Sequence, residues 1–89
     1  MQKIHSKLFE ECYNNIPPEQ KLEGELSYGI AEKIYATLQE KGMSQKDFAR
    51  QLGKRESEIS KWLTGRHNFT LQTLALISTE LGVNLITVA

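Results

Sequence analysis

The stretch Gln45–Leu63 holds two short amphipathic segments joined at a single glycine, and it restricts the fold more than any other feature of the chain. Ala49 precedes Gly53 by four positions, and Ile59 follows it by six. Two helices that cross at about 90–120° need a glycine where the chain reverses and a small side chain where they approach each other. Ile59 and Trp62 share one face of the second segment, so its opposite face is polar. The spacing predicts two short crossed helices.

Apolar residues at helical spacing predict three further helices, so the expected fold class is all-α with five helices. The first covers residues 4–13 and ends before Pro17 and Pro18, because proline disfavours helix in the residue before it. A short linker runs through Gly24. The next helix is then expected to start at Ser27, as its N-cap, and to stop at Gly42.

Polar caps mark the remaining helices. Ser44, with Asp47 three residues later, caps the first helix of the crossed pair, and the second runs from about Arg55 to Leu63. Thr70 caps a last helix that Gly82 closes. The side chains expected to face the core are Ile30, Ala31, Ile34, Tyr35, Leu38, Phe48, Ala49, Leu52, Ile59, Trp62, Leu63, Leu71, Leu74, Ala75, Ile77 and Leu81.

The C-terminal residues 83–88 are rich in β-branched side chains and predict a short extended strand. A lone strand leaves backbone groups unpaired, so we expect it to pair with the same strand of a second copy. Leu85, Ile86 and Val88 are then the candidate dimer contacts, with the N-terminal helix as the alternative dimer surface.

The net charge is zero, but the charges are unevenly distributed. Residues 1–40 hold four lysines against seven glutamates, whereas residues 41–66 hold seven basic groups against three carboxylates. Phosphate binding depends on a local basic face rather than on the total charge. At 89 residues there is room for one domain, and its basic part coincides with the crossed helices.

Several classes of function are disfavoured. The chain has no glycine-rich phosphate loop and no nucleophile with a spaced base, so we expect neither enzyme activity nor a cofactor. His5 and Cys12 have no supporting ligands that would predict a metal site. No apolar run approaches the roughly 18 residues of a membrane span. The charged N-terminus and the single cysteine favour a cytoplasmic protein.

The stretch from Met43 to Val83 resembles the helix-turn-helix domain of the Xre/Cro/phage-repressor family. The features that match are Ser44-Gln45, Ala49, Leu52-Gly53, Ile59-Ser60, Gly65, Leu71, Leu74, Ile77 and Leu81-Gly82-Val83. With the preceding helix, the resemblance covers residues 27–83, which leaves 1–26 as an N-terminal helical extension and 84–89 as a tail. It implies a lambda-repressor-like fold that binds double-stranded DNA as a homodimer on a palindromic operator and represses transcription.

The family's DNA-contacting positions carry over to nine residues of this chain. The resemblance implies phosphate contacts from Gln45, Arg66, His67 and Asn68, and contacts at the bases from Arg55, Glu56, Ser57, Ser60 and Lys61. Lys54 is a tenth candidate, for a phosphate contact, because it is basic and adjacent to this motif. The family commonly has an apolar residue where Lys54 stands and a Ser or Thr cap where Arg55 stands, so the cap is lost or moved here. Glu56 has two interpretations: it caps the helix start, or it accepts a hydrogen bond from a cytosine amino group.

A second resemblance, to antitoxins of the HigA type, rests on the acidic N-terminal extension. It gives an alternative function: an antitoxin that binds a small basic toxin through this segment and represses its own operon. A degenerate helix-turn-helix fold used only for protein contact is disfavoured by the basic segment 41–66.

Overall fold

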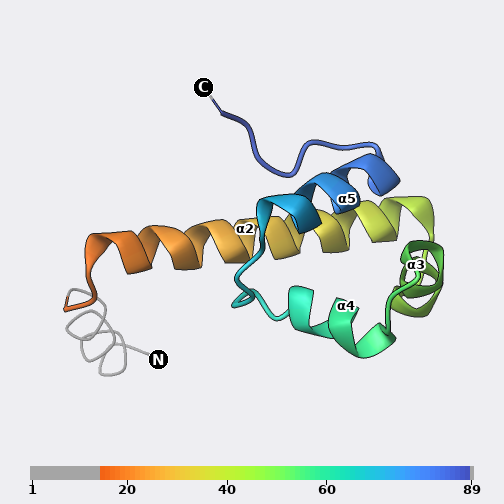
Figure 1. Cartoon of the computed structure of the whole chain (residues 1–89), viewed down its shortest axis with the longest axis horizontal. Coiled ribbons are helices and arrows are strands. Elements are labelled where there is room, and N and C mark those ends of the chain that lie inside the picture. The colour runs from red at the N-terminus through yellow and green to blue at the C-terminus, as the bar shows by residue number, and fades with distance from the viewer. Residues whose placement is uncertain (1–14, 89) are drawn as a thin grey trace, which may run out of the picture.

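The computed structural model describes residues 15–88, and these fold into four helices with no strand. The helices are α2 (Pro18–Lys41), α3 (Gln45–Leu52), α4 (Glu56–Trp62) and α5 (Leu71–Leu81) (Figure 1). The all-α expectation is confirmed for this part of the chain, but the count of five helices is not reproduced. The helix expected over residues 4–13 lies outside the described residues.

Helix α2 begins well before the expected position. Pro18 occupies its first turn and Pro17 is its N-cap, so the expected linker through Gly24 is helical. Proline suits the first helical position because its fixed φ is already helical and its missing N–H is not needed there. Ser27, the expected N-cap, instead lies within the helix and is buried. The linker prediction was wrong because the strong helix formers around Gly24 outweigh the cost of about 1 kcal/mol for one helical glycine.

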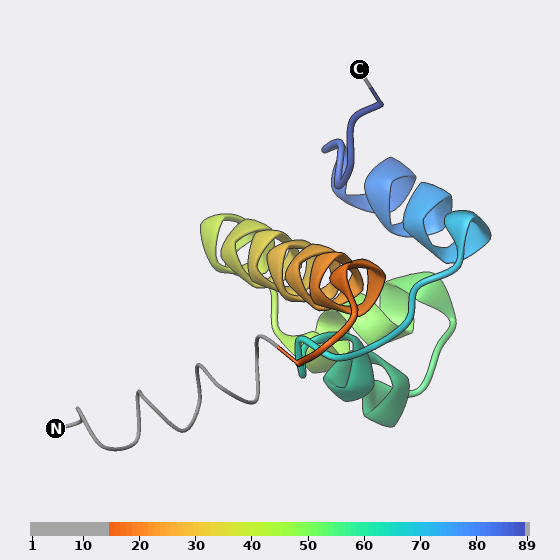
Figure 2. The same ribbon diagram turned by 90° about the vertical axis from the view of Figure 1, so that its left-hand side faces the viewer.

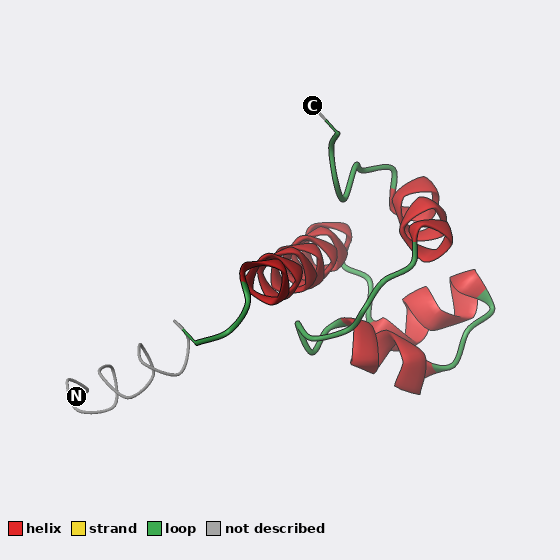
Figure 3. Cartoon of the chain, turned by 60° about the vertical axis from the view of Figure 1, so that its left-hand side comes forward, coloured by secondary structure: helices red, strands yellow, loops and turns green. Residues whose placement is uncertain are grey.

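The core lies where α2 and α5 meet the α3–α4 pair. Figures 2 and 3 show α2 and α5 on one side of the molecule and the two short helices on the other. Phe48 from α3 and Ile59 from α4 are completely buried, together with Ile34 from α2 and Ile77 from α5. Each of the four helices therefore supplies one fully buried side chain, and the position of α4 depends on all the others.

Several expectations for apolar side chains were wrong. Tyr35 on α2 and Ala75 on α5, expected to face the core, are both exposed. Leu71, expected to face the core, is 76% exposed at the start of α5, while Leu74, Ile77 and Leu81 carry the buried face. Residues 83–88 form no strand, and Leu85 joins the core of its own chain. Leu85 is thus unavailable as a dimer contact, because folding of the protomer already buries it.

Candidate nucleic-acid interface

Helix α3 and the turn after it form as predicted. The Ser44 hydroxyl accepts a hydrogen bond from the Asp47 backbone N–H at 3.0 Å, which caps the start of α3. Gly53 ends the helix with a φ of 69°, a left-handed conformation that glycine adopts without steric cost. The N–H of Lys54 then donates to the Ala49 carbonyl at 2.9 Å. This closed turn sets the direction in which α4 leaves.

The start of α4 is stabilised by a residue that the sequence analysis did not single out. Arg55 is the N-cap in an extended conformation, and the Glu58 carboxylate accepts a hydrogen bond from its backbone N–H at 3.0 Å. Glu58 stands at the position where the acidic half of a capping box is expected, and that was the signal available in the sequence. The proposed capping role of Glu56 is therefore corrected: Glu58 makes the capping bond, and Glu56 lies exposed in the first turn.

Helix α4 has one buried and one exposed face. Ile59 and Trp62 are buried, and the Trp62 ring meets the Phe48 ring of α3 edge-on, with centroids 6.5 Å apart. Such edge-to-face pairs fix the relative orientation of the rings as well as burying apolar area. The remaining surface of α4 is polar and solvent-exposed; it consists of Glu56, Ser57, Ser60 and Lys61. These are the helix positions predicted to contact bases.

A direct hydrogen bond joins two predicted contact residues across the helix pair. The Ser60 hydroxyl of α4 donates to the side-chain oxygen of Gln45, at the start of α3, at 3.2 Å. Because the amide oxygen of Gln45 accepts this bond, its NH2 group is the part that can donate to a phosphate. The structure thus brings Gln45 and Ser60 together and links the predicted phosphate contact to the helix that is predicted to read bases.

The turn after α4 is held by Thr64, which the sequence analysis passed over. Its hydroxyl donates to the Lys61 carbonyl at 2.8 Å and accepts from the Arg66 backbone N–H at 3.2 Å. Arg66 and Asn68 are exposed, as predicted for backbone contacts. His67 differs, since its half-buried ring packs edge-on against Phe69 at a centroid distance of 4.8 Å.

The basic side chains of this surface are not neutralised by any described residue. Lys54, Arg55, Lys61 and Arg66 are all exposed. None of them forms an ion pair with another residue in the range 15–88. No hydrogen bond directly connects Lys54 or Arg55 with Gln45 or Ser60 in that range. The four cations remain available to an external anion, which is what a phosphate-contacting surface requires.

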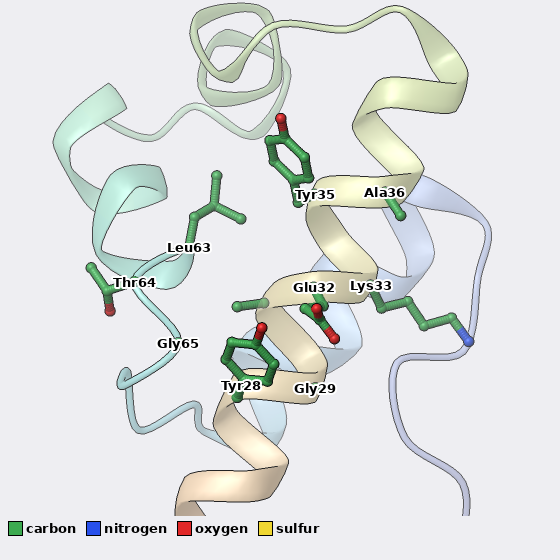
Figure 4. A pocket seen from close by; sticks show the side chains of 10 residues that line it. Tyr28, Gly29, Glu32, Lys33, Tyr35, Ala36, Leu63, Thr64 and Gly65 are labelled. Carbon is green, nitrogen blue, oxygen red and sulfur yellow. The ribbon is translucent and has the colours of Figure 1, made fainter. Parts of the chain in front are cut away.

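The same turn rests against α2 through Gly65 and Tyr28. Gly65 is buried with a φ of 84°, and a Cβ at this position would lie 3.1 Å from Cδ1 of Tyr28. Figure 4 shows both residues at a surface groove between α2 and the end of α4. A hydrogen bond to Glu32 and the charge of that carboxylate raise the pKa of the Tyr28 hydroxyl. Tyr28 was not predicted as a site residue, although it supports the turn that carries Arg66.

We expect Gly65→Ala to destabilise the fold by about 1–2 kcal/mol, because an L-residue is strained at positive φ and the added methyl meets Tyr28. Urea denaturation followed by fluorescence of Trp62, the only tryptophan, measures the change. Gly24→Ala is the matched control: it lies within α2 with nothing near its added methyl, so it should stabilise by about 0.5–1 kcal/mol. Equal stability of wild type and Gly65→Ala would contradict the prediction.

Neither a membrane span nor a metal-binding cluster is found in the described part of the chain. None of its helices is long and apolar enough to cross a bilayer. Among residues 15–88, no three His, Cys, Asp or Glu side chains are grouped so that they could hold a metal ion.

Comparison with protein-family models matches residues 34–87 to the helix-turn-helix family. The match covers more than half of the chain, so the chain belongs to this family. The family is the Cro-type, Xre-like group of helix-turn-helix proteins. The match begins within α2 and includes most of the C-terminal tail. Membership identifies the domain as one of DNA-binding transcription regulators. No curated protein and no solved structure matches the chain.

Proposed function

We propose that this protein is a cytoplasmic, sequence-specific repressor that binds double-stranded DNA as a homodimer on a palindromic operator. The observation that carries the proposal is the polar face of α4. Ser57, Ser60 and Lys61 are exposed there, while Ile59 and Trp62 anchor the opposite face in the core. A helix held in this way can enter a major groove without losing its packing.

In the proposed complex, α4 enters the major groove with its N-terminus first. Phosphate contacts from Gln45, Lys54, Arg66 and Asn68 set the register, and they carry no sequence information by themselves. Arg55 and Lys61 are the proposed readers of guanine, because their side chains donate hydrogen bonds to its O6 and N7. The packing of His67 against Phe69 makes it a support for the turn in this proposal, with phosphate contact secondary.

Two residues of the α4 first turn are proposed to add base discrimination. Ser57 can donate or accept at several base edges. Glu58 makes the capping bond, so the exposed carboxylate of Glu56 is free of that role and can accept a hydrogen bond from a cytosine amino group. Exchanging that cytosine for thymine, which has no amino group, should weaken binding of the wild-type protein and leave Glu56→Gln less affected.

The homodimer is part of the same proposal. Two protomers related by a twofold axis would read half-sites about 34 Å apart, one turn of B-DNA. With Leu85 buried, the remaining apolar candidates from the tail are Ile86, which is 39% exposed, and Val88, which is 90% exposed. Sedimentation of the wild-type protein and of Val88→Ser, both without DNA, measures how much Val88 contributes to the dimer. An unchanged dimer in the variant would place the interface elsewhere.

The decisive test is a fluorescence-anisotropy titration at physiological salt. DNA from upstream of the protein's own gene is compared with a scrambled duplex of the same composition. Specific repressors discriminate by factors of roughly 10³ or more, so we expect at least a thousandfold tighter binding to the native sequence. Equal weak binding to both duplexes would contradict the proposal for that operator.

A second candidate function, the antitoxin alternative, is favoured by one observation. The N-terminal half of α2 is acidic and carries exposed leucines, as a surface that covers a small basic toxin would. The test is co-expression with the product of the adjacent gene. Growth arrest that this chain relieves would support the antitoxin function, and a product that has no effect on growth would remove it.

A further inference from the structure

An apolar groove of about 280 Å³ lies between the N-terminal half of α2, the segment before α5 and the C-terminal tail. Its floor consists of Ile30, Phe69 and Leu74, which belong to the core or pack against it. Its sides include Leu22 and Leu26 from α2 and Ile86 from the tail. We call these residues, together with Glu19 and Glu23 at the edge, the α2–tail groove.

The sides of the α2–tail groove are exposed to an unusual degree for leucine. Leu22 is 56% and Leu26 is 51% exposed, and Ile86 also stands in solvent. Figure 1 shows that this end of α2 extends beyond α3, α4 and α5, so none of those helices covers it. Contiguous exposed apolar side chains on a small soluble domain mark an interaction site more often than isolated ones do.

The charge of the groove determines the chemistry of its occupant. Glu19 and Glu23 are one helical turn apart and line the same groove as Leu22 and Leu26. A partner with apolar side chains flanked by lysine or arginine would bury the leucines and neutralise both carboxylates. An acidic or neutral partner would bury the same apolar area and leave the two carboxylates without a counter-charge.

The chain itself does not offer such a segment. Seven of its eleven basic residues lie in 41–66, four of them on the surface proposed to contact DNA, and residues 67–89 contain no lysine or arginine. An isologous pairing of two α2 helices would place Glu19 and Glu23 opposite carboxylates of the second copy. Residues 1–14 hold two lysines against two glutamates, so the segment as a whole has no net positive charge to offset two further carboxylates. We therefore favour an occupant with a net positive charge from a second protein.

We propose that the α2–tail groove is the docking site for a basic amphipathic helix of a second protein. Apolar side chains at i and i+4 would insert between Leu22, Leu26 and Ile86, with basic residues facing Glu19 and Glu23, in the helix-in-groove mode. The docking surface rests on the fold alone and does not depend on DNA binding. For the antitoxin alternative, this helix would belong to the toxin.

Docking at this site would also reach the DNA-contacting surface. Asn68 lines the α2–tail groove and belongs to the turn proposed to contact the DNA backbone. An occupant that contacts Asn68 competes with the DNA phosphate at this position, so the partner helix and the operator should weaken each other's binding. This coupling rests on the proposed function, whereas the docking site does not.

The test uses the full chain and a fluorescein-labelled synthetic helix with leucines at i, i+4 and i+7 and lysines on both flanks. We expect saturable binding by anisotropy, reduced at least tenfold by Leu26→Ser and by Glu19→Lys combined with Glu23→Lys. The matched controls are Leu71→Ser and Glu40→Lys, which change exposed residues outside the groove and should bind within twofold of wild type. Because Leu26 is half-exposed, Leu26→Ser should keep the wild-type circular dichroism spectrum.

Several results would overturn the proposal. The first is that the lysine-flanked helix does not bind. The second is that a glutamate-flanked helix binds as tightly as the lysine-flanked one. The third is that the control variants lose as much peptide affinity as the groove variants. A tenfold gain in peptide affinity after deletion of residues 1–14 would assign the groove to that segment. A dimer-to-monomer shift of Leu26→Ser in sedimentation would assign it to a second copy. Operator affinity of Leu26→Ser, measured separately, distinguishes failure of the docking site from failure of the DNA-binding proposal.

Discussion

Replacing Phe48 by alanine is expected to lower the free energy of unfolding by about 3–5 kcal/mol, the range found for large aromatic side chains removed from a core. The Phe48 side chain is completely buried, and its ring supports Trp62 of α4. A domain of this size has about 5–15 kcal/mol of stability in total, so the variant should be close to unfolding at room temperature. Thermal unfolding followed by circular dichroism measures the loss.

Leu71→Ala is the matched control for Phe48→Ala. Leu71 is apolar and helical but largely exposed, so its truncation should change stability by no more than about 0.5 kcal/mol. A Phe48→Ala loss as small as that of Leu71→Ala would mean that α3 and α4 do not pack through this ring. Since the ring contact positions α4, such a result would also remove the structural support for the DNA-binding surface.

Arg55→Ala and Lys61→Ala should each weaken binding to the operator by about 1–3 kcal/mol, which corresponds to roughly 5–150-fold. A side chain that donates to a base edge leaves the base unsatisfied when it is removed, and the loss depends on the sequence. The cap of α4 should survive in Arg55→Ala, because Glu58 bonds to the backbone N–H of Arg55 rather than to its side chain. Anisotropy titrations on operator and scrambled DNA give both affinities.

Lys33→Ala is the control for these two variants. Lys33 is an exposed cation on α2 whose side chain points away from α4 in Figure 4, so its removal should change operator affinity by less than about twofold. If Arg55→Ala or Lys61→Ala weakened binding to operator and scrambled DNA equally, that residue would be a phosphate contact, and its assignment as a base reader would be wrong.

Much of the helix-turn-helix unit could be predicted because its determinants are local. The Ser44 and Thr70 caps each bond to the backbone three residues later, and Gly53 ends α3 through its own φ. The inward positions of Phe48, Ile59 and Trp62 follow from helical spacing, since a residue and its neighbours one turn away share a face. The Glu58 cap is equally local, but arginine is not a common N-cap residue, so the sequence signal for this cap is weak.

The candidate site was predicted less completely than the helices that carry it. Ser57, Lys61 and Arg66 are exposed, and their contacts with DNA stay predictions. The support of the turn by Tyr28 and the packing of His67 on Phe69 did not follow from spacing. Tyr28 is far from Gly65 in the sequence, and only the closure of α2 over the end of α4 brings them together.

Local sequence was enough to predict the all-α class of the described residues, the crossed pair around Gly53 and the basic character of that pair, because bonds and spacings within a few residues encode them. Local sequence did not show that Leu71 faces solvent while Leu85 joins the core, or that Leu22 and Leu26 line an open groove, because these depend on how the helices and the tail pack. The physical reason is that burial depends on which distant elements cover a side chain. The hydrophobicity of a leucine side chain is the same whether it is covered or exposed, so it does not by itself decide burial.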